Sequence, residues 1–176
     1  MFVKLKNPHD ITTYYPKNKI AEYGKHVNDK FYGITQYSID TETSTKLLSI
    51  IPEKYRHLYY ATLMTINSPF ITPHIDERST SLNFYIKSSG AVTSFYREKY
   101  PGVPSTLSGD TKAKVYDESD LVLVSSFTAT PGEIYLLNTQ AIHGVSGISD
   151  NMRIACTIES FYISYEDTKE ILKDLY

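Results

Sequence analysis

The sequence predicts a mainly β protein with flanking helices, built as a two-sheet sandwich or jelly roll. Eight runs rich in β-branched and aromatic residues follow one another, and most are separated by short Gly, Pro, Ser and Asn breaks. Tyrosine, which favours strands, occurs 16 times, whereas tryptophan is absent. A chain of 176 residues has about the size of one domain. We therefore expect a single domain over residues 1–176.

The flanking elements follow from turn signals and periodicity. Residues 1–35 carry several Pro and Gly turn signals, so they are expected to be irregular. A polar, Thr/Ser-rich start followed by a cluster of Leu and Ile predicts a short amphipathic helix over Thr41–Ile51, stopped by Pro52. These parts form an N-terminal flanking region of about 1–57. At the other end Ser164 offers a cap for a second helix over about 164–176.

The segment from about 58 to 161 is expected to hold the β core. Its predicted strands are Leu58–Ile66, Ile71–Asp76, Thr80–Lys87, Val92–Glu98, Leu121–Thr130, Glu133–Asn138, Ala141–Val145 and Met152–Phe161. The connection Tyr100–Asp120 is different because it is polar throughout and contains two prolines and two glycines. A connection of this length is often a lid over a functional site, and a disordered surface loop is equally compatible with it.

Composition limits the classes of partner. The net charge is −2 and the chain has only four arginines, which disfavours duplex nucleic acid as the main partner. Lysines and tyrosines gather in the first 30 residues, where a solvated surface is the favoured interpretation. The single cysteine, Cys156, excludes an intramolecular disulfide and lies in an apolar run, as a small core residue would. No apolar run of about 18 residues and no signal-peptide pattern is present, so we expect a cytoplasmic protein without a membrane partner.

The triplet His74-Ile75-Asp76 is the first candidate for chemistry. Such a triplet often occurs by chance, so its setting decides its meaning. On an extended run, residues two apart point to one face of the sheet, and Pro73 biases this segment away from helix. His143 lies on a separate predicted strand. Two imidazoles and one carboxylate form the facial triad that holds iron(II) in non-haem oxygenases. The sequence therefore predicts a metal site made of these two histidines and Asp76.

Arg153 opens the last predicted strand, and its planar guanidinium could bind a dicarboxylate through two hydrogen bonds. With H-x-D first, a distal His next and a basic residue last, residues 58–161 resemble the iron(II)/2-oxoglutarate-dependent dioxygenase family. The resemblance implies a double-stranded β-helix, which is a cupin-like jelly roll of eight core strands. It also implies that His74, Asp76 and His143 bind Fe(II). Arg153 would then bind the far carboxylate of 2-oxoglutarate.

The run RSTSLNFYIK over 78–87 is similar to the strand that follows H-x-D in the prolyl-hydroxylase branch. The resemblance implies that Tyr85 donates to the same carboxylate. Strand alternation then turns Asn83 and Ser81 inward as well, where Asn83 could contact 2-oxoglutarate or substrate; the alternative is a solvent-exposed face. Two positions depart from the pattern. Ala155 replaces a serine or threonine that many members have, and Met64 replaces a tyrosine of the prolyl hydroxylases, for which Tyr60 or Thr62 could substitute.

The resemblance implies a hydroxylase that uses Fe(II), 2-oxoglutarate and O₂ and releases succinate and CO₂. Its target would be an unactivated C–H bond, most simply on an amino-acid side chain, in a peptide or in a free amino acid. Related halogenases replace the carboxylate ligand with a small residue, so Asp76 favours hydroxylation. Two alternatives remain open: a dioxygenase that oxidises an alkylated nucleobase, and a non-catalytic jelly-roll binding protein.

Overall fold

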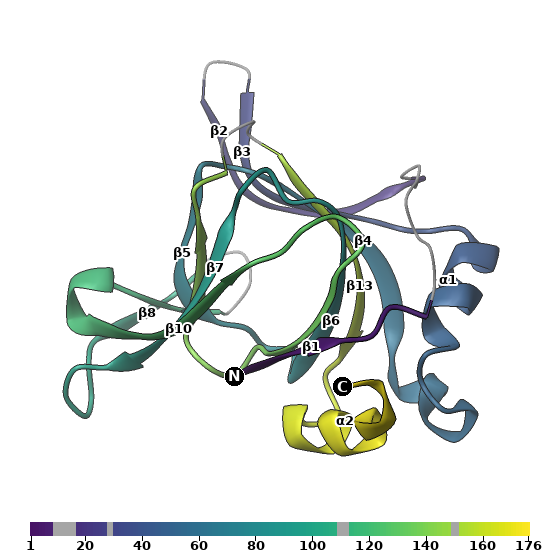
Figure 1. Ribbon diagram of the computed structural model, residues 1–176. Coiled ribbons are helices and arrows are strands. Elements are labelled where there is room, and N and C mark those ends of the chain that lie inside the picture. The colour runs from purple at the N-terminus through teal and green to yellow at the C-terminus, as the bar shows by residue number, and fades with distance from the viewer. Residues whose placement is uncertain (9–16, 28–29, 109–112, 149–151) are drawn as a thin grey trace.

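The computed structural model describes residues 1–8, 17–27, 30–108, 113–148 and 152–176, which form two antiparallel sheets (Figure 1). The seven-stranded sheet has the order β1 (Phe2–Leu5), β11 (Ile134–Asn138), β6 (Thr80–Lys87), β13 (Arg153–Ser160), β4 (Tyr60–Asn67), β3 (Lys30–Tyr37) and β2 (Lys19–Val27). The six-stranded sheet has the order β10 (Leu121–Thr128), β7 (Val92–Glu98), β12 (His143–Ser146), β5 (Phe70–Ile75), β9 (Lys114–Tyr116) and β8 (Ser105–Leu107). The mainly β fold predicted from the sequence is confirmed.

Both predicted helices are present, and each begins at a side-chain cap. Helix α1 covers Thr41–Leu48, and the Asp40 carboxylate accepts a hydrogen bond of 2.8 Å from the backbone N–H of Thr43. A 3₁₀ helix, η1, follows at Glu53–Leu58. Helix α2 covers Tyr165–Ile171, and Ser164 caps it as predicted. A short 3₁₀ helix, η3 (Lys173–Leu175), ends the chain. The sequence placed the end of α1 three residues too late, because Ile50 and Ile51 are buried beyond the helix rather than on it.

The expectation of an irregular segment over 1–35 is wrong for the residues that the structure describes there. Strand β1 pairs with β11 at one edge of the larger sheet, and β2 and β3 form a hairpin at the other edge, where β3 joins β4. Part of the predicted segment, residues 9–16 and 28–29, lies outside the described residues. The β sheet therefore includes strands from the region that the sequence assigned to flanking structure.

The connection 100–120 is also more regular than its composition suggested. It contains β8 and β9, which extend the smaller sheet, and a 3₁₀ turn, η2 (Glu118–Asp120); residues 109–112 lie outside the described residues. Strand β9 pairs with β5, and Val115 lies opposite His74. This connection therefore adds a strand beside the candidate site, and its role as a lid stays a prediction.

Alternation along the larger sheet separates a packed outer face from a polar inner face. Leu82 and Phe84 of β6 point outward and pack with Leu47 of the α1 helix and Leu172, which follows α2. Cys156 belongs to the same buried cluster, as expected. The intervening side chains of β6 point inward and line a cavity between the two sheets. The helices stabilise the sheet from outside, so the inner face is available for polar chemistry.

Glu133 links strand β1 to the turn before β11 through an ion pair and a hydrogen bond. Its carboxylate pairs with Lys4 and accepts a hydrogen bond of 2.9 Å from the backbone N–H of Thr130. Burial would raise the pKa of Glu133, but the hydrogen bonds from Lys4 and Thr130 outweigh this and lower it to about 2. The folded pKa lies below the unfolded value of 4.5. This carboxylate therefore stabilises the fold fully above about pH 4.5, and the contribution disappears as the pH falls toward about 2.

We expect Glu133→Gln to lower the free energy of unfolding by about 1 kcal/mol at pH 7, because one partly exposed ion pair and one charged acceptor are lost. Urea denaturation of both proteins should show this difference shrinking below about pH 4.5. Lys4→Met, which removes the partner, should reproduce most of the difference at pH 7. A difference between wild type and Glu133→Gln that persists unchanged at pH 2 would contradict this explanation.

None of the helices in the described ranges has the length and apolar character that a bilayer crossing requires.

Candidate metal centre

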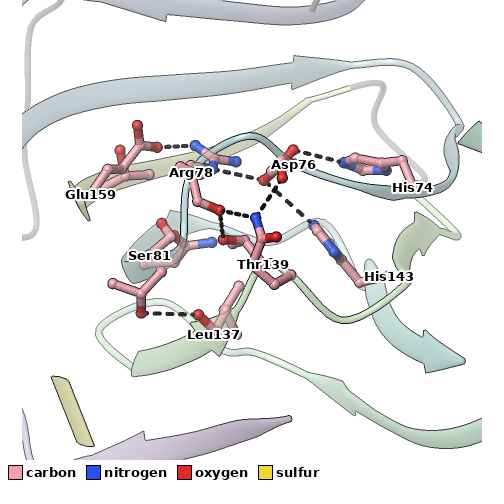
Figure 2. Close-up of polar contacts among 12 residues, drawn as sticks. His74, Asp76, Arg78, Ser81, Leu137, Thr139, His143 and Glu159 are labelled. Atoms are coloured by element: carbon pink, nitrogen blue, oxygen red, sulfur yellow. Dashed lines mark hydrogen bonds and ion pairs between the residues drawn. The ribbon is translucent and has the colours of Figure 1, made fainter. Parts of the chain in front are cut away.

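Three side chains with metal-binding groups converge between the two sheets. His74 lies near the end of β5, Asp76 directly follows that strand, and His143 begins β12. Antiparallel pairing of β5 with β12 places the two histidines opposite each other, with ring centroids 4.4 Å apart. One potential ligand atom from each of the three residues lies within 4.8 Å of the others (Figure 2). The structure therefore brings the predicted triad together as one candidate metal centre.

The backbone fixes the orientation of both imidazole rings. The Nδ1 atom of His74 lies 2.8 Å from the carbonyl oxygen of Thr72, and Nδ1 of His143 lies 2.9 Å from that of Ala141. A carbonyl can only accept, so each Nδ1 carries the proton. Each Nε2 is then left to face Asp76, at 3.3 Å for His74 and 3.8 Å for His143. This is the tautomer that a metal bound through Nε2 requires.

The electrostatics of the centre favour a carboxylate beside a neutral imidazole. Burial, reinforced by the nearby His74, lowers the pKa of His143 to about 4. Burial alone would raise the pKa of Asp76, but Arg78 and His74 hold it well below its usual range. Burial alone would lower the pKa of His74, but its hydrogen bond to Asp76 raises it. A metal ion would therefore meet an ionised Asp76 and a neutral His143, and would release any proton held by His74.

The carboxylate of Asp76 forms an ion pair with Arg78. The Nε atom of Arg78 donates a hydrogen bond of 2.7 Å to Oδ2 of Asp76, and its Nη1 donates to the buried carboxylate of Glu159. Tyr60 donates a hydrogen bond of 2.7 Å to the other oxygen of Glu159. Figure 2 shows this chain running from Glu159 through Arg78 to Asp76. The sequence predicted Asp76 as a metal ligand but gave no role to Arg78.

The turn before β12 is tied to the segment that carries Asp76. The backbone N–H of Asp76 donates to the carbonyl of Thr139 at 3.0 Å, and the Gln140 side-chain amide donates at 2.6 Å to the carbonyl of Asp76. Thr139 and Gln140 also donate to the carbonyl of Arg78, at 2.6 and 2.9 Å. These bonds fix the position of Asp76 relative to the strand that begins at His143.

Arg153, at the start of β13, faces the same cavity and is 2% exposed. Its Nη2 donates a hydrogen bond of 2.9 Å to Oγ1 of Thr93, and its guanidinium carbon lies 4.5 Å from the centre of the Tyr85 ring. Its Nε is buried without a hydrogen-bond partner. Within the part of the chain that the structure describes, no carboxylate pairs with it. A buried cation with an unused donor is suited to bind an anion.

The inward face of β6 is buried, so the solvent-exposed alternative for this strand is wrong. Tyr85, Asn83 and Ser81 all line the cavity. Ser81 donates a hydrogen bond of 2.6 Å to Oδ1 of Asn83, and Asn83 donates one of 3.3 Å to the Tyr85 hydroxyl. The Tyr85 hydroxyl keeps its own proton as a donor. The ring face of Tyr85 also stacks against Arg153, a role that the sequence did not suggest.

The cavity has a polar part and an apolar part, and the two are adjacent, because Ile66 lies opposite Arg153 and Val145 lies opposite Thr93 on neighbouring strands. The residues of the apolar part are Ile34, Met64, Ile66, Ile71 and Val145. Met64 therefore forms part of the apolar wall of the cavity. Its neighbours Tyr60 and Thr62 bond to Glu159 and Thr157 instead of supplying a substitute for the missing tyrosine.

Sequence reasoning missed four residues around this site, which are Thr93, Arg78, Gln140 and Glu159. Thr93 is a candidate for the donor that Ala155 lacks, since it already contacts Arg153. Arg78 binds the side chain of Asp76, and Gln140 binds its backbone carbonyl. Thr93 is 60 positions from Arg153, and Glu159 is 81 positions from Arg78. No local pattern signals contacts over such separations, although Arg78 could have been suspected from its place two residues beyond a metal ligand.

No protein-family model matches the chain, and no curated protein matches it. Several solved structures are similar to the chain. The non-heme alpha-ketoglutarate-dependent epimerase SnoN from nogalamycin biosynthesis superposes with a TM-score of 0.52 and 11% identity, covering 99% of this chain and 84% of SnoN. Vicilin from Capsicum annuum gives a TM-score of 0.45 and 12% identity over 80% of this chain. Oxalate decarboxylase from Bacillus subtilis gives 0.39 and 12% over 82%.

The chain spans 30% of the vicilin and 28% of the decarboxylase. Identities this low concern the fold alone. The superposition on SnoN agrees with the two-sheet topology described above, so the chain has a jelly-roll fold.

Proposed function

We propose that this protein is an Fe(II)- and 2-oxoglutarate-dependent oxygenase that hydroxylates an unactivated C–H bond, most simply on an amino-acid side chain. One observation carries the proposal: His74, Asp76 and His143 form one cluster, and its two histidines line a cavity together with Arg153, a buried cation with an unused donor. A metal-binding group and an anion-binding group in one cavity are what a metal-chelating dicarboxylate needs.

The donor set fits iron(II). Two imidazoles and one carboxylate provide three ligands and leave other positions free, as in non-haem iron oxygenases. The carbonyls of Thr72 and Ala141 orient the two rings, and Arg78 orients the carboxylate. The group is therefore preorganised, which raises metal affinity.

The polar groups of the cavity match the chemistry of 2-oxoglutarate. Arg153 would bind the carboxylate far from the metal, while the hydroxyls of Thr93 and Tyr85 lie beside the guanidinium to add hydrogen bonds. When bound, iron(II) and 2-oxoglutarate together supply the activation of O₂ and the removal of hydrogen from carbon, with succinate and CO₂ as products. The protein's own residues bind these groups, orient them and exclude water.

The apolar part of the cavity supports an aliphatic target. Its walls are isoleucine, valine and methionine, and the charged groups that line the cavity, Arg78 and Arg153, belong to the ligand network and to the anion site. These walls adjoin the anion site, since Ile66 lies opposite Arg153 and Val145 opposite Thr93, so an uncharged aliphatic group bound there would lie next to the co-substrate. Neither alternative, a nucleobase oxidase or a non-catalytic binding protein, is favoured by an observation of this kind.

Anaerobic protein mixed with Fe(II) and 2-oxoglutarate tests the proposal. We expect the weak visible absorption of the metal chelate, followed by slow succinate formation when O₂ is admitted. His143→Ala removes one of the three ligands and should abolish both signals. Absence of the absorption band in wild type, or equal behaviour of wild type and His143→Ala, would refute the proposal. Once a substrate is found, product mass distinguishes addition of oxygen from the stereochemical inversion implied by the name of SnoN.

A further inference from the structure

Two buried charged residues near the candidate metal centre have no part in binding iron or 2-oxoglutarate. The Glu159 side chain is 1% exposed and the Arg78 side chain 16% exposed, and they form an ion pair. Burying two charges is expensive in free energy, and a well-packed apolar pair is often as stable. A stabilising role alone is therefore a weak explanation for placing this pair beside a metal ligand.

The geometry of Arg78 links this pair to the metal ligand. Its two nitrogens contact two different carboxylates, with Nε on Asp76 and Nη1 on Glu159. A planar guanidinium can do this because its donors have fixed directions, whereas a lysine ammonium cannot hold the same fork. Glu159 is itself fixed by the Tyr60 hydroxyl at 2.7 Å. The position of Arg78 is thus set from the side opposite to the metal centre.

Arg78 contacts only one of the two oxygens of Asp76. Oδ2 accepts its hydrogen bond at 2.7 Å, while Oδ1 lies 3.3 Å from Nε2 of His74. The backbone carbonyl of Arg78 is held in turn by Thr139 and Gln140. Oδ2 is therefore engaged by Arg78 and also lies 3.8 Å from Nε2 of His143, whereas Oδ1 faces His74 and has no contact with Arg78.

We propose that Arg78, fixed by Glu159, is a positioning residue that presents Asp76 to the metal through a single oxygen. The inference rests on the metal site of the proposed function. A carboxylate free of this contact could rotate and bind with both oxygens, which would fill a position that a chelating co-substrate needs. Arg78 thereby sets the affinity of the site for metal and the number of positions that the protein itself occupies.

The metal alone is the probe, so no substrate is required. Mn(II) binding is measured by the loss of the free-ion paramagnetic resonance signal, and the visible spectrum of bound Co(II) reports the number of ligands. The variants are Arg78→Lys, Glu159→Gln and the double change Arg78→Met with Glu159→Gln, which removes the pair without leaving Glu159 as a lone buried charge, while Asp76 keeps its contact with His74. Arg97→Met, on the exposed end of β7, controls for loss of an arginine elsewhere.

We expect the double variant to bind Mn(II) about 10- to 100-fold more weakly than wild type, as loss of a residue that orients a metal ligand usually does. Arg78→Lys should show an intermediate loss, Glu159→Gln a smaller one, and Arg97→Met none. The Co(II) spectrum of the double variant should show a higher coordination number. Circular dichroism without metal identifies which variants fold, and the decision rests on those.

Folded variants with the Mn(II) affinity and Co(II) spectrum of wild type would overturn the inference. If the double variant does not fold, Arg78→Lys and Glu159→Gln decide by the same measurements. Failure of wild type to bind Mn(II) or Co(II) would instead refute the metal site itself. The two failures are therefore distinguishable.

Discussion

Replacing Arg153 with methionine is expected to weaken 2-oxoglutarate binding by about 30-fold or more, equivalent to at least about 2 kcal/mol. The reason is that the Arg153 side chain is buried. Arg153 is 2% exposed, so an anion bound to it is largely shielded from water, and its charge has no other carboxylate partner among the described residues. Methionine keeps much of the side-chain volume, so the cavity should not collapse. Metal affinity should stay close to that of wild type, because the triad does not contact Arg153 through any bond in the structure.

Two titrations of the same protein separate these effects. Mn(II) is titrated without co-substrate, and 2-oxoglutarate is titrated into the anaerobic Fe(II) form while the chelate absorption is followed. Arg153→Lys is the matched control, since it keeps the charge but loses the planar fork, and an intermediate loss is expected. Equal losses of metal and 2-oxoglutarate affinity in Arg153→Met would mean that Arg153 maintains the cavity instead of binding the anion.

Gly144→Ala is expected to damage the metal centre through the backbone. A Cβ atom at this position would lie 2.9 Å from the carbonyl oxygen of Ile71 and 3.3 Å from the backbone nitrogen of Pro73. Both atoms belong to β5, so neither can move away like a flexible side chain. Strand β12 must shift away from β5, and His143 directly precedes the glycine. We expect a loss of about 1–3 kcal/mol in stability, as for other overpacked sites, and weaker metal binding.

Thermal unfolding without metal and Mn(II) titration measure the two consequences. For a domain of this size, about 1 kcal/mol corresponds to a change in Tm of roughly 2–4 °C. Ser146→Ala, at the exposed end of the same strand, is the control and should behave as wild type. A Gly144→Ala protein with unchanged Tm and unchanged Mn(II) affinity would show that the two strands are not packed as tightly as described.

Local sequence patterns predicted the strands that carry most of the site. The predicted ranges Thr80–Lys87 and Val92–Glu98 coincide with β6 and β7, because β-branched and aromatic residues fill them and turn residues bound them. His74 and Asp76 were recognised for a related reason. Their spacing along an extended run is itself the geometric requirement, so the sequence contained it directly.

The strands before Thr41 could not be recognised in the same way. Strand β1 owes its structure to β11, which comes more than a hundred residues later, and to the Lys4–Glu133 pair. Strands β2 and β3 are polar for much of their length, so their sequence offers no clear apolar alternation. Tertiary pairing decides the structure of such segments, and propensity does not.

The electrostatic surroundings of Asp76 show the same limit. The sequence shows that Arg78 is near Asp76, but not that its guanidinium turns back toward it. That orientation depends on Glu159, a buried acid on the last strand. The inner-face position of Glu159 was predictable from alternation, whereas its partner depends on how the two sheets are brought together.

The pairing of His74 with His143 across β5 and β12 also has a thermodynamic consequence. The two strands meet only in the folded sheet, so an unfolded chain has no preformed site. A metal that binds there binds the native state, and its binding free energy adds to the free energy of folding. At a free-metal concentration one hundred times Kd, the added stability would be about 2.7 kcal/mol. The rise in melting temperature that each metal ion causes therefore shows which ion the protein binds most tightly, before any reaction is known.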